Sequence, residues 1–478
     1  MKYLQHIVLS TFTAFFVLTN IHSQKVYDLI VAQDGSGDYQ FISSAVSRTS
    51  NSRKKIFIKN GIYKEKVLID VNKKNVHLIG ESVDGVIITY DDYNGKSGDI
   101  TTATSYTVKI EADGFYAENI TFENTSTAAQ AVAIYATADT IAFKNCKFLG
   151  YQDTHYADNG RQYYLNCETR GDVDFIFGSA AAYYDHSKII SRKRKDGYIT
   201  APSETVIKST KPGGITFYHG ILFKDCTISA EPGLTDNSCY MGRPWGPNSS
   251  SVFINCTIGN HVKPEGWATW DNNNNHLSAY FAEYNSTQPG GGLLDVSKRV
   301  EWSKQITESD TSFYSISYYF KGWNPLKKTI ALAPPANPII TGDSVKWNKI
   351  DNARGYIIIR NDSVVGFSVT TSFYHAGITS SPYKIKSVNI YGAMSKPSTI
   401  ASGINNNATK ENYQVQFLNG ELLTPEYKEI IIYDITGKQV KSDVSNNRIS
   451  LQNLKTGIYI ARIKLKDDSL LTYKFCKN

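Results

Sequence analysis

An asparagine returns at a fixed spacing through the middle of the chain, and this repeat constrains the fold more than any other feature. Asn124, Asn145 and Asn166 lie 21 residues apart, each after a short segment rich in aromatic and apolar residues. Looser copies follow around Asp225 and Asn255. Short β-rich segments that recur at twenty-odd residues are typical of a solenoid in which each coil stacks on the previous one. With three short strands per coil, the repeat predicts a parallel β-helix.

The residues at the repeated turn predict how neighbouring coils join. An asparagine there can adopt the left-handed conformation and bond to the asparagine of the next coil. Cys146 and Cys167 directly follow two of these asparagines, and we expect them to stack as small buried thiols rather than form a disulfide. The six cysteines of the 478-residue chain include no CxxC pair, so we expect neither a zinc site nor a disulfide scaffold.

The N-terminal segment is typical of a secretory signal. Lys2 supplies a positive start, Ile7 to Leu18 form a short apolar core, and Ser23 is a small residue suited to cleavage. We therefore predict a signal peptide over residues 1–23. No other apolar run is long enough to cross a bilayer, so we expect an exported, soluble protein.

Next, the segment "DGSGDYQFISSAVS" predicts a turn and a short helix that caps the open end of the solenoid. Glu65, in "GIYKE", is expected to be structural. The repeat fades after "GWNPL" at residues 322–326, which gives a β-helix domain over residues 26–326.

Two smaller β-rich modules are predicted beyond the solenoid. The Pro-rich stretch "ALAPPANP" is a linker, and the alternating segments "SVKWNKI", "GYIIIRND" and "YKIKSVNIYG" predict a small antiparallel sandwich at residues 335–402. Trp347 and Tyr383 are its expected core residues. This stretch resembles a fibronectin type III module.

After a second linker, "ASGINNNATKEN", residues 411–478 carry "YDITGK" and "GIYIARIKL". They resemble the C-terminal sorting domain of the type IX secretion system, which implies passage across the outer membrane. The alternative is another β-module that binds polysaccharide. Together these patterns predict an all-β protein.

Carboxamide and carboxylate side chains recur at the spacing of the coils. Gln130 lies 23 residues before Asp153, and Asp174 lies 21 residues after it, so these groups can meet on one outer face. Gln152 adjoins Asp153 in "GYQDTHY". Both aspartates have apolar and aromatic neighbours, where a carboxylate is costly unless it is paired or used. Arg243, in "MGRPW", is a candidate partner.

Six segments, "GIYKEKV", "NITFENT", "QAVAI", "GYQDTHY", "DVDFIFG" and "MGRPW", occur in the order found in pectin methylesterases. The resemblance spans residues 28 to 323, about three-fifths of the chain. It implies a right-handed parallel β-helix that hydrolyses the methyl esters of galacturonate in pectin and needs no metal or cofactor.

The resemblance also implies a role for each matching residue. Asp174 matches the nucleophile, Asp153 the general acid and base, and Gln152 and Gln130 the amides that stabilise the oxyanion. Arg243 matches the residue that holds the nucleophile. Two close carboxyls push their pKa values apart. We therefore expect Arg243 to keep Asp174 ionised and Asp153 to carry the proton.

The expected substrate contacts surround these groups. Gln130 and Arg243 are included in this set, and Thr102 and Trp245 match further contact positions. Tyr156 and Phe177 are either core residues or the lining of a groove on which sugars pack.

Two positions depart from the family pattern. Many relatives have an aromatic residue where this chain has Ala103, with Tyr106 nearby instead, and leucine where it has His155. Residues 153 and 155 of a strand would point to the same face, so a charged His155 would lower the pKa of Asp153. No mechanistic step requires this histidine, however, and we favour a bystander.

Other pectin-active or pectin-binding proteins are the alternatives. A pectin lyase would need a calcium cluster of acids, and a polygalacturonase would need aspartates that activate water across a glycosidic bond. The acid pair Asp91–Asp92 lacks the companion motifs of either. A non-catalytic adhesin would keep the aromatic groove but not the acid and nucleophile. The net charge of +7 is mild. We expect a monomer that binds methylesterified homogalacturonan and the secretion machinery, and no nucleic acid.

Overall fold

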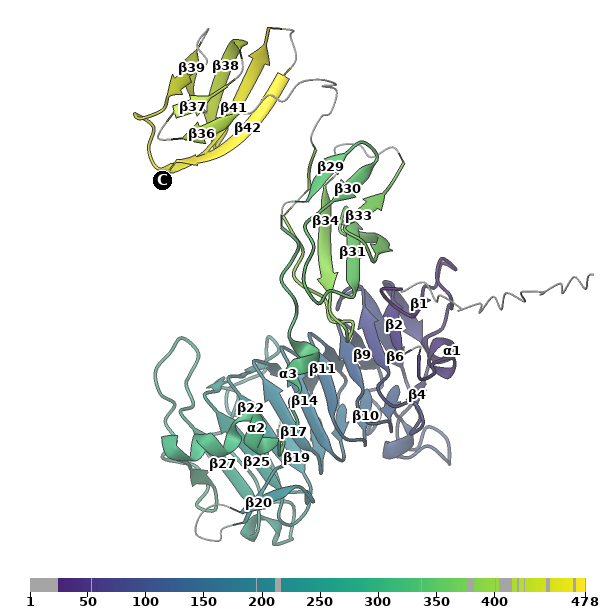
Figure 1. Cartoon of the computed structure of the whole chain (residues 1–478). Helices are drawn as coiled ribbons and strands as arrows, with labels where there is room; N and C mark the ends of the chain where they lie inside the picture. Colours follow the sequence, from purple (N-terminus) through teal and green to yellow (C-terminus); the bar gives the residue numbers. More distant parts are fainter. Residues whose placement is uncertain are drawn as a thin grey trace, which may run out of the picture. The chain divides into compact units, whose positions relative to one another are not determined.

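The computed structural model describes residues 25–477, except 53, 195, 211–215, 337, 377–381, 400, 404–414, 419–420, 425, 444–447 and 467–469. The predicted signal peptide, residues 1–23, lies outside the described residues. Three large sheets of parallel strands wind around one core, and successive coils stack along the molecule (Figure 1). The parallel β-helix predicted from the repeat is therefore confirmed.

The central coils each contribute one strand to each sheet, and the coils at the two ends contribute fewer. The 11-stranded sheet contains β1 (Leu29–Val31), β2 (Lys55–Ile58), β5 (His77–Gly80), β8 (Tyr116–Glu118), β11 (Ile141–Lys144), β14 (Arg161–Leu165), β17 (Ala181–Asp185), β22 (Ile221–Lys224), β25 (Ser250–Ile254), β27 (Tyr280–Tyr284) and β28 (Lys304–Gln305). The 7-stranded sheet contains β4 (Val67–Ile69), β7 (Val108–Ile110), β10 (Ile134–Ala136), β13 (His155–Ala157), β16 (Ile176–Gly178), β19 (Gly197–Pro202) and β24 (Cys239–Gly242). The 8-stranded sheet contains β3 (Gly61–Lys64), β6 (Val86–Tyr90), β9 (Thr121–Asn124), β12 (Lys147–Leu149), β15 (Glu168–Gly171), β18 (Lys188–Ser191), β23 (Thr227–Ala230) and β26 (Thr257–Ile258).

Stacked aromatic side chains hold the coils in register inside the β-helix. Phe143, Tyr164, Tyr184, Phe223 and Phe253 occupy paired positions on successive strands of the 11-stranded sheet. Their neighbouring rings stack with centroids 4.4 to 5.1 Å apart. A slip of one residue would turn every inward side chain outward, so this stack fixes the pairing of the coils.

The asparagine ladder exists, but one of its members was placed wrongly. Asn145 and Asn166 have the expected left-handed conformation, with φ of 51° each. The partner of Asn145 is Asn119 (φ 57°), whose Oδ1 accepts from Asn145 Nδ2 at 3.4 Å. Asn124 instead ends β9 and is buried. The coil from Asn119 to Asn145 has 26 residues, so a constant period of 21 residues selects the wrong asparagine.

Cys146 and Cys167 follow the ladder as expected. Both are buried, and both are free thiols. Burial, together with the neighbouring Cys167 thiol, raises the pKa of Cys146 well above its ordinary value, which keeps this thiol neutral.

A short helix caps the N-terminal end of the β-helix, as predicted. Helix α1 (Ile42–Ser47) buries Ile42, Ala45 and Val46 against the core. The carboxylate of Glu65 accepts hydrogen bonds from the backbone N–H groups of Ile42 (2.8 Å) and Ser43 (3.0 Å). Glu65 thus has a structural role, because it satisfies donors that a helix start leaves open.

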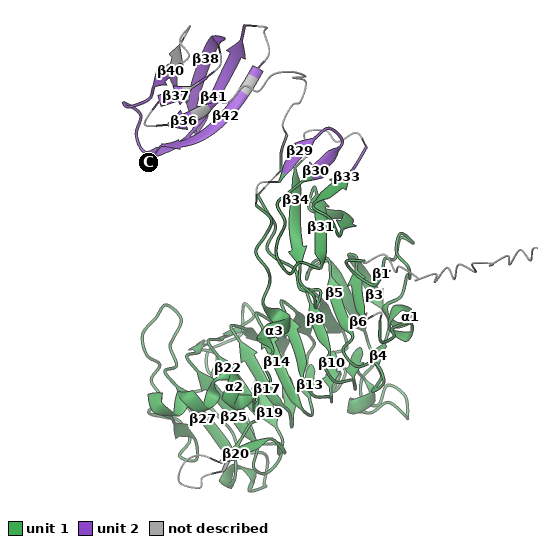
Figure 2. Cartoon of the chain, viewed as in Figure 1, with its two compact units in different colours: residues 1–338, 346–373, 381–401 green, residues 339–345, 374–380, 402–478 purple. Residues whose placement is uncertain are grey.

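The chain forms two compact units, coloured separately in Figure 2. The first contains the β-helix, the helices α2 (Ile316–Tyr319) and α3 (Leu326–Thr329), and a small antiparallel sheet of β31 (Gly355–Arg360), β32 (Ser363–Ser368) and β34 (Tyr383–Val388). The hairpin of β20 (Lys208–Thr210) and β21 (Thr216–Tyr218) also belongs to it. The expected core residues Trp347 and Tyr383 are both buried.

The small sheet of the first unit packs directly on the β-helix. Ile357, Val388 and Met394 join Phe57 and Tyr116 in one buried apolar cluster. We call this contact the docking face.

Polar contacts surround the docking face. Arg354 donates to Asp28 Oδ1 at 2.7 Å, and the backbone N–H of Met394 donates to Glu118 at 3.2 Å. Glu118 is itself buried and paired with Lys144 at 3.0 Å. This sheet is therefore an integral layer of the first unit.

The second unit is built of small sheets. It includes β29 (Ile339–Thr341), the first two residues of β30 (Ser344–Lys346) and β35 (Ser402–Gly403). One further sheet contains β36 (Gln416–Leu418), β37 (Glu421–Leu423) and β40 (Arg448–Ser450), and another contains β38 (Tyr427–Asp434), β39 (Gln439–Asp443), β41 (Gly457–Leu465) and β42 (Leu470–Lys477). The last two sheets share one apolar core that includes Ile432 and Ile463. Among the described residues, none of the helices is both long and apolar enough to span a bilayer.

Candidate active site

Asp153 and Asp174 lie at equivalent turns of consecutive coils. Asp153 comes just before β13 and Asp174 just before β16, in the sheet of seven strands. Both residues have left-handed backbone conformations, with φ of 64° and 50°. Aspartate tolerates this conformation, which costs most other residues free energy. The backbone N–H of Asp153 donates to Val173 O at 3.1 Å, so the two turns are held against each other.

Arg243 forms a bidentate ion pair with Asp174. Its Nε and Nη2 donate to the two carboxylate oxygens at 2.9 and 2.6 Å. The guanidinium also faces the rings of Tyr198 and Trp270, at 4.0 and 4.1 Å from their centroids. Asp174 is only 5% exposed. Burial raises the pKa of Asp174, and the hydrogen bonds and charge of Arg243 oppose that rise.

The compensation at Asp153 is weaker, because Arg243 forms its two hydrogen bonds with Asp174 and acts on Asp153 through its charge alone. Burial raises the pKa of Asp153 well above its ordinary value, and the charge of Asp174 raises it further. Arg243 opposes these effects, while Asp172 adds to them. Of the two carboxyls, Asp153 is therefore the one that favours the protonated form. Asp172, which we did not predict, is paired with Arg194 at 3.5 Å.

The two glutamines lie on neighbouring coils beside the carboxyls. Gln130 precedes β10, and the backbone N–H of the next residue, Ala131, donates to Gln152 O at 3.1 Å. The side-chain Oε1 of Gln130 accepts from Asn94 Nδ2 at 3.3 Å. Within the described part of the chain, the Gln152 amide makes no hydrogen bond to protein, so it is available to a ligand.

A row of stacked aromatic rings runs across the same sheet. Tyr135, Tyr156 and Phe177 pair across β10, β13 and β16. Neighbouring ring centroids are 4.3 and 4.2 Å apart. Trp245, 40% exposed, meets Phe177 edge-on at 6.1 Å. Tyr135 was missed, although it stands 21 residues before Tyr156, as Tyr156 does before Phe177.

The loop before β7 borders this row. Ala103 and Tyr106 pack against the cluster that contains Tyr135 and Phe177, together with Trp270. Thr102 begins the short 3-10 helix η1 (Thr102–Thr104) of this loop. Tyr106, three residues after Ala103, thus supplies an aromatic ring to the same cluster.

His155 does not face Asp153. The prediction that both residues point to one face of a strand is wrong, because Asp153 lies in the turn before β13. His155 is fully buried inside the β-helix, where its ring nitrogens bond to the hydroxyls of Tyr164 (2.9 Å) and Tyr184 (3.1 Å). Burial lowers the pKa of His155 to about 3, so the ring is neutral and cannot tune Asp153 by charge.

The site residues do not form a metal-binding cluster. In the described chain, the one group of carboxylate and imidazole ligands close enough to share a cation is Asp185, which ends β17, with His186 and Asp225, which follow β17 and β22. Asp185 there already accepts from the hydroxyl of Tyr163 at 2.6 Å.

Comparison with known proteins agrees with the fold. Residues 28–322 match the pectinesterase family model, and residues 399–478 match that of a secretion system C-terminal sorting domain. The chain is 36% identical over 286 residues to pectinesterase 4 of Arabidopsis thaliana, covering 58% of this chain and 47% of the relative. It is 38% identical over 287 residues to a probable pectinesterase/pectinesterase inhibitor of Brassica napus, with the same coverage. The chain spans about half the length of the curated relatives it matches.

Solved structures are similar over the β-helix. The pectin methylesterase from carrot is 34% identical, with a TM-score of 0.55 over 62% of this chain and 93% of that one. A pectin methylesterase mutant crystallised in complex with a hexasaccharide is 27% identical, with a TM-score of 0.53 over 63% of this chain and 98% of that one. The resemblance to a sorting domain at the C-terminus is confirmed by the second family model. The family model for the β-helix covers well over half of the residues, and the chain belongs to the pectinesterase family.

Proposed function

We propose that this protein hydrolyses galacturonate methyl esters in pectin, giving de-esterified pectin and methanol. One observation carries the proposal: a carboxylate held at both oxygens by Arg243 adjoins a second carboxyl that favours its protonated form. This is the pairing that an ester hydrolase with a carboxylate nucleophile needs. The family of the chain and the hexasaccharide complex of a relative support pectin as the substrate.

In the first step, an oxygen of Asp174 attacks the ester carbonyl carbon. The carbonyl oxygen becomes an oxyanion, and the amide N–H groups of Gln152 and Gln130 donate to it. Arg243 keeps Asp174 ionised before the attack and fixes the direction of its oxygens. As the carbonyl re-forms, the bond to the methoxy oxygen breaks.

Next, methanol leaves, and water then hydrolyses the covalent intermediate. Methoxide is a poor leaving group, so Asp153 gives it a proton and methanol departs. An anhydride between Asp174 and galacturonate remains. Asp153, now ionised, accepts a proton from water, whose oxygen attacks the galacturonate carbonyl. The anhydride then splits, which regenerates the Asp174 carboxylate and the Asp153 acid.

The aromatic row forms the proposed sugar groove. Tyr156 and Phe177 lie in the sheet whose turns carry the carboxyls, and exposed Trp245 adjoins Phe177. Aromatic rings pack well against the apolar faces of sugars. We assign Thr102 and Trp245 to the rims of this groove, with Gln130 and Arg243 contacting the reacting unit.

Methanol release decides between this function and its rivals. Purified protein incubated with highly methylated pectin should release methanol and one acid equivalent per ester, without new reducing ends or unsaturated products. New reducing ends would indicate a polygalacturonase, and unsaturated products a lyase. Binding to pectin without methanol would favour an adhesin and refute the proposal.

Substitution of Asp153 by asparagine should lower kcat by about 100- to 10,000-fold, because the proton donor is lost.

The same substitution should stabilise the protein at high pH. The pKa of Asp153 is higher in the folded than in the unfolded protein. As pH rises above about 4, the unfolded chain therefore loses this proton first, and the free energy of unfolding falls until the folded-state pKa is passed.

The asparagine side chain of this variant has no such proton to lose. Thermal unfolding at pH 4 and pH 8 should show that Asp153→Asn gains stability relative to the parent only at the higher pH. An equal change at both values would mean that Asp153 has an ordinary pKa in the folded protein. In the parent, kcat should fall on the alkaline side as Asp153 ionises.

We also propose that the protein is exported. The match to a sorting domain over residues 399–478 supports recognition of this segment by secretion machinery. In that case pectin would be met outside the cell or at its surface.

A further inference from the structure

In the loop between β6 and β7, Asn94 bonds to the candidate oxyanion donor Gln130. Within residues 91–105, Asn94 makes two hydrogen bonds to Gln130. Its backbone N–H donates to Gln130 O at 2.9 Å, and its side-chain Nδ2 donates to Gln130 Oε1 at 3.3 Å. In the described part of the chain, Asn94 is the sole hydrogen-bond partner of the Gln130 side chain.

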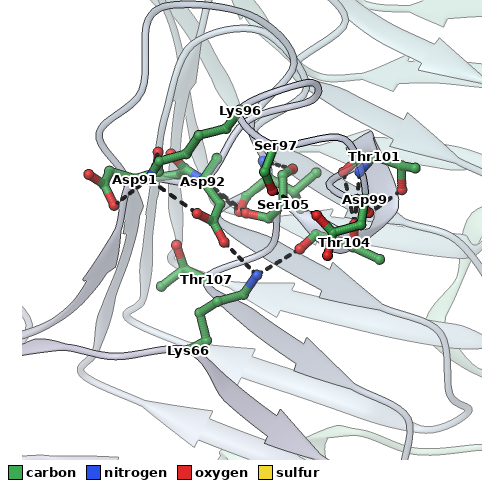
Figure 3. A network of polar contacts seen from close by, with 12 residues as sticks. Lys66, Asp91, Asp92, Lys96, Ser97, Asp99, Thr101, Thr104, Ser105 and Thr107 are labelled. Carbon is green, nitrogen blue, oxygen red and sulfur yellow. Dashed lines mark hydrogen bonds and ion pairs between the residues drawn. The ribbon is translucent and has the colours of Figure 1, made fainter.

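The loop that carries Asn94 is firmly anchored on both sides of it. Lys66 Nζ donates to Asp92 Oδ2 and to Thr104 O, both at 2.7 Å, and so ties the start of the loop to its end (Figure 3). Lys96 donates to Asp91 and Asp92 at 3.1 and 3.2 Å.

The buried side chain of Asn124 joins the two ends of the loop by hydrogen bonds. Asn124, at the end of β9, donates to Asp92 O at 2.9 Å and to Ser105 O at 3.1 Å. Asn94 thus stands two residues after a fixed point, in a loop whose ends are joined.

The hydrogen bond from Asn94 determines which end of the Gln130 amide faces the reaction. A glutamine amide has a donor end and an acceptor end, and which end faces the reaction depends on its partners. Asn94 Nδ2 is a donor only, so it holds the Oε1 end of Gln130 and leaves the two N–H groups of Nε2 for another acceptor. If the Gln130 amide alone were flipped, two NH₂ groups would face each other. The observed orientation leaves both N–H groups of Gln130 Nε2 for a developing oxyanion.

We propose that Asn94 is a positioning residue for esterolysis, which fixes the Gln130 amide so that its N–H groups face the oxyanion. This rests on the proposed function, because it presumes that Gln130 is an oxyanion donor. Asn94 is exposed, and a single exposed hydrogen bond adds little to folding stability. Its loss should therefore change kcat far more than the melting temperature.

Two substitutions of Asn94 test this. Asn94→Ala removes the side-chain donor and keeps the backbone bond. Asn94→Asp also keeps the shape, but its carboxylate can only accept, so it would draw Gln130 Nε2 away from the reaction. We expect kcat for methanol release to fall about 10-fold in the first and up to about 100-fold in the second, with KM changed less than about twofold.

The double-mutant cycle with Gln130→Ala is the decisive measurement. Gln130→Ala alone should lower kcat by about 100-fold or more. If Asn94 acts through Gln130, Asn94→Ala should have no further effect in that background. An equal loss in both backgrounds, or a parent-like kcat for both Asn94 variants, would overturn the proposal.

Asp99→Asn is the matched control, since Asp99 lies in the same loop but bonds to Ser97. A loss in this control as large as that of Asn94→Ala would also overturn it.

A spectroscopic readout separates this inference from the proposed function. With glutamine labelled by ¹⁵N, the Nε2 signals of Gln130 are those missing in Gln130→Ala. They should shift in Asn94→Asp whether or not methanol is formed. A parent protein without methanol release refutes the proposed function alone, whereas unmoved Gln130 signals refute the role of Asn94 alone.

Discussion

Replacing Asp174 by asparagine should abolish methanol release, with kcat at least about 1,000-fold below that of the parent. Asparagine keeps the size of the side chain and one oxygen for Arg243, but a neutral amide is not a nucleophile. The loss should be in kcat and not in KM, because the substitution leaves Tyr156, Phe177 and Trp245 of the proposed groove in place.

The structure of the site makes Asp174→Asn a clean test. Burial disfavours the charge of Asp174, so its removal relieves that cost, while Arg243 keeps its contacts with the rings of Tyr198 and Trp270. We expect circular dichroism and cooperative unfolding like those of the parent. Arg243→Lys is the matched companion, since a single ammonium cannot hold both oxygens. It should reduce kcat less than Asp174→Asn does. Methanol release by Asp174→Asn within tenfold of the parent would exclude this residue as the nucleophile.

Shortening the protein to residues 25–326 should cost it most of its stability. This version ends where the sequence repeat ends, but it lacks the sheet of β31, β32 and β34. Phe57, Ile79 and Tyr116 are fully buried in the docking face. Exposing three such side chains costs about 5 kcal/mol or more, a large part of the free energy of unfolding of a typical protein. We expect aggregation, or a melting temperature lower by about 10 °C or more.

Two controls separate loss of the docking face from mere shortening. A protein of residues 25–403 lacks the sorting segment but keeps the sheet, and it should melt like the full chain. In the full chain, Ile357→Asp places a charge in the docking face, whereas Ser363→Asp places one at an exposed position of the same sheet. Only Ile357→Asp should be destabilised. A version of residues 25–326 that melts with the full chain would show that the docking face contributes little.

Much of the site followed from the repeat. Asp153 and Asp174 stand one coil apart, and their equivalent turns could be read from a spacing of 21 residues. The same spacing would have yielded Tyr135. It failed for Asn124, because the coil from Asn119 to Asn145 is longer and a period cannot locate the extra residues. The placement of His155 on the same face as Asp153 was wrong for a related reason, since strand alternation does not extend through the turn at Asp153.

Other parts had no sequence signal. Tyr198 and Trp270 flank Arg243, but they come from separate coils, and no periodicity links them to "MGRPW". Asn94 lies in a loop whose path depends on ion pairs of Lys66 and Lys96. Alternation in "GYIIIRND" indicated a strand with a buried face, but not that this face packs on the β-helix. Sequence periodicity indicates the type of an element and its buried face. It does not indicate which other part of the protein that face packs against.

The docking face also bears on the order in which the protein can mature. Its two halves come from opposite ends of the first unit's sequence, with Tyr27 and Phe57 on one side and Val388 and Met394 on the other. During synthesis from the N-terminus, the last strand of the β-helix is complete at Gln305, well before Val388 and Met394 of the covering sheet have been made. The first unit is therefore complete only when the chain has been made to about Ala401. An intermediate with an open apolar flank is a natural ligand for chaperones, and it remains one until that point.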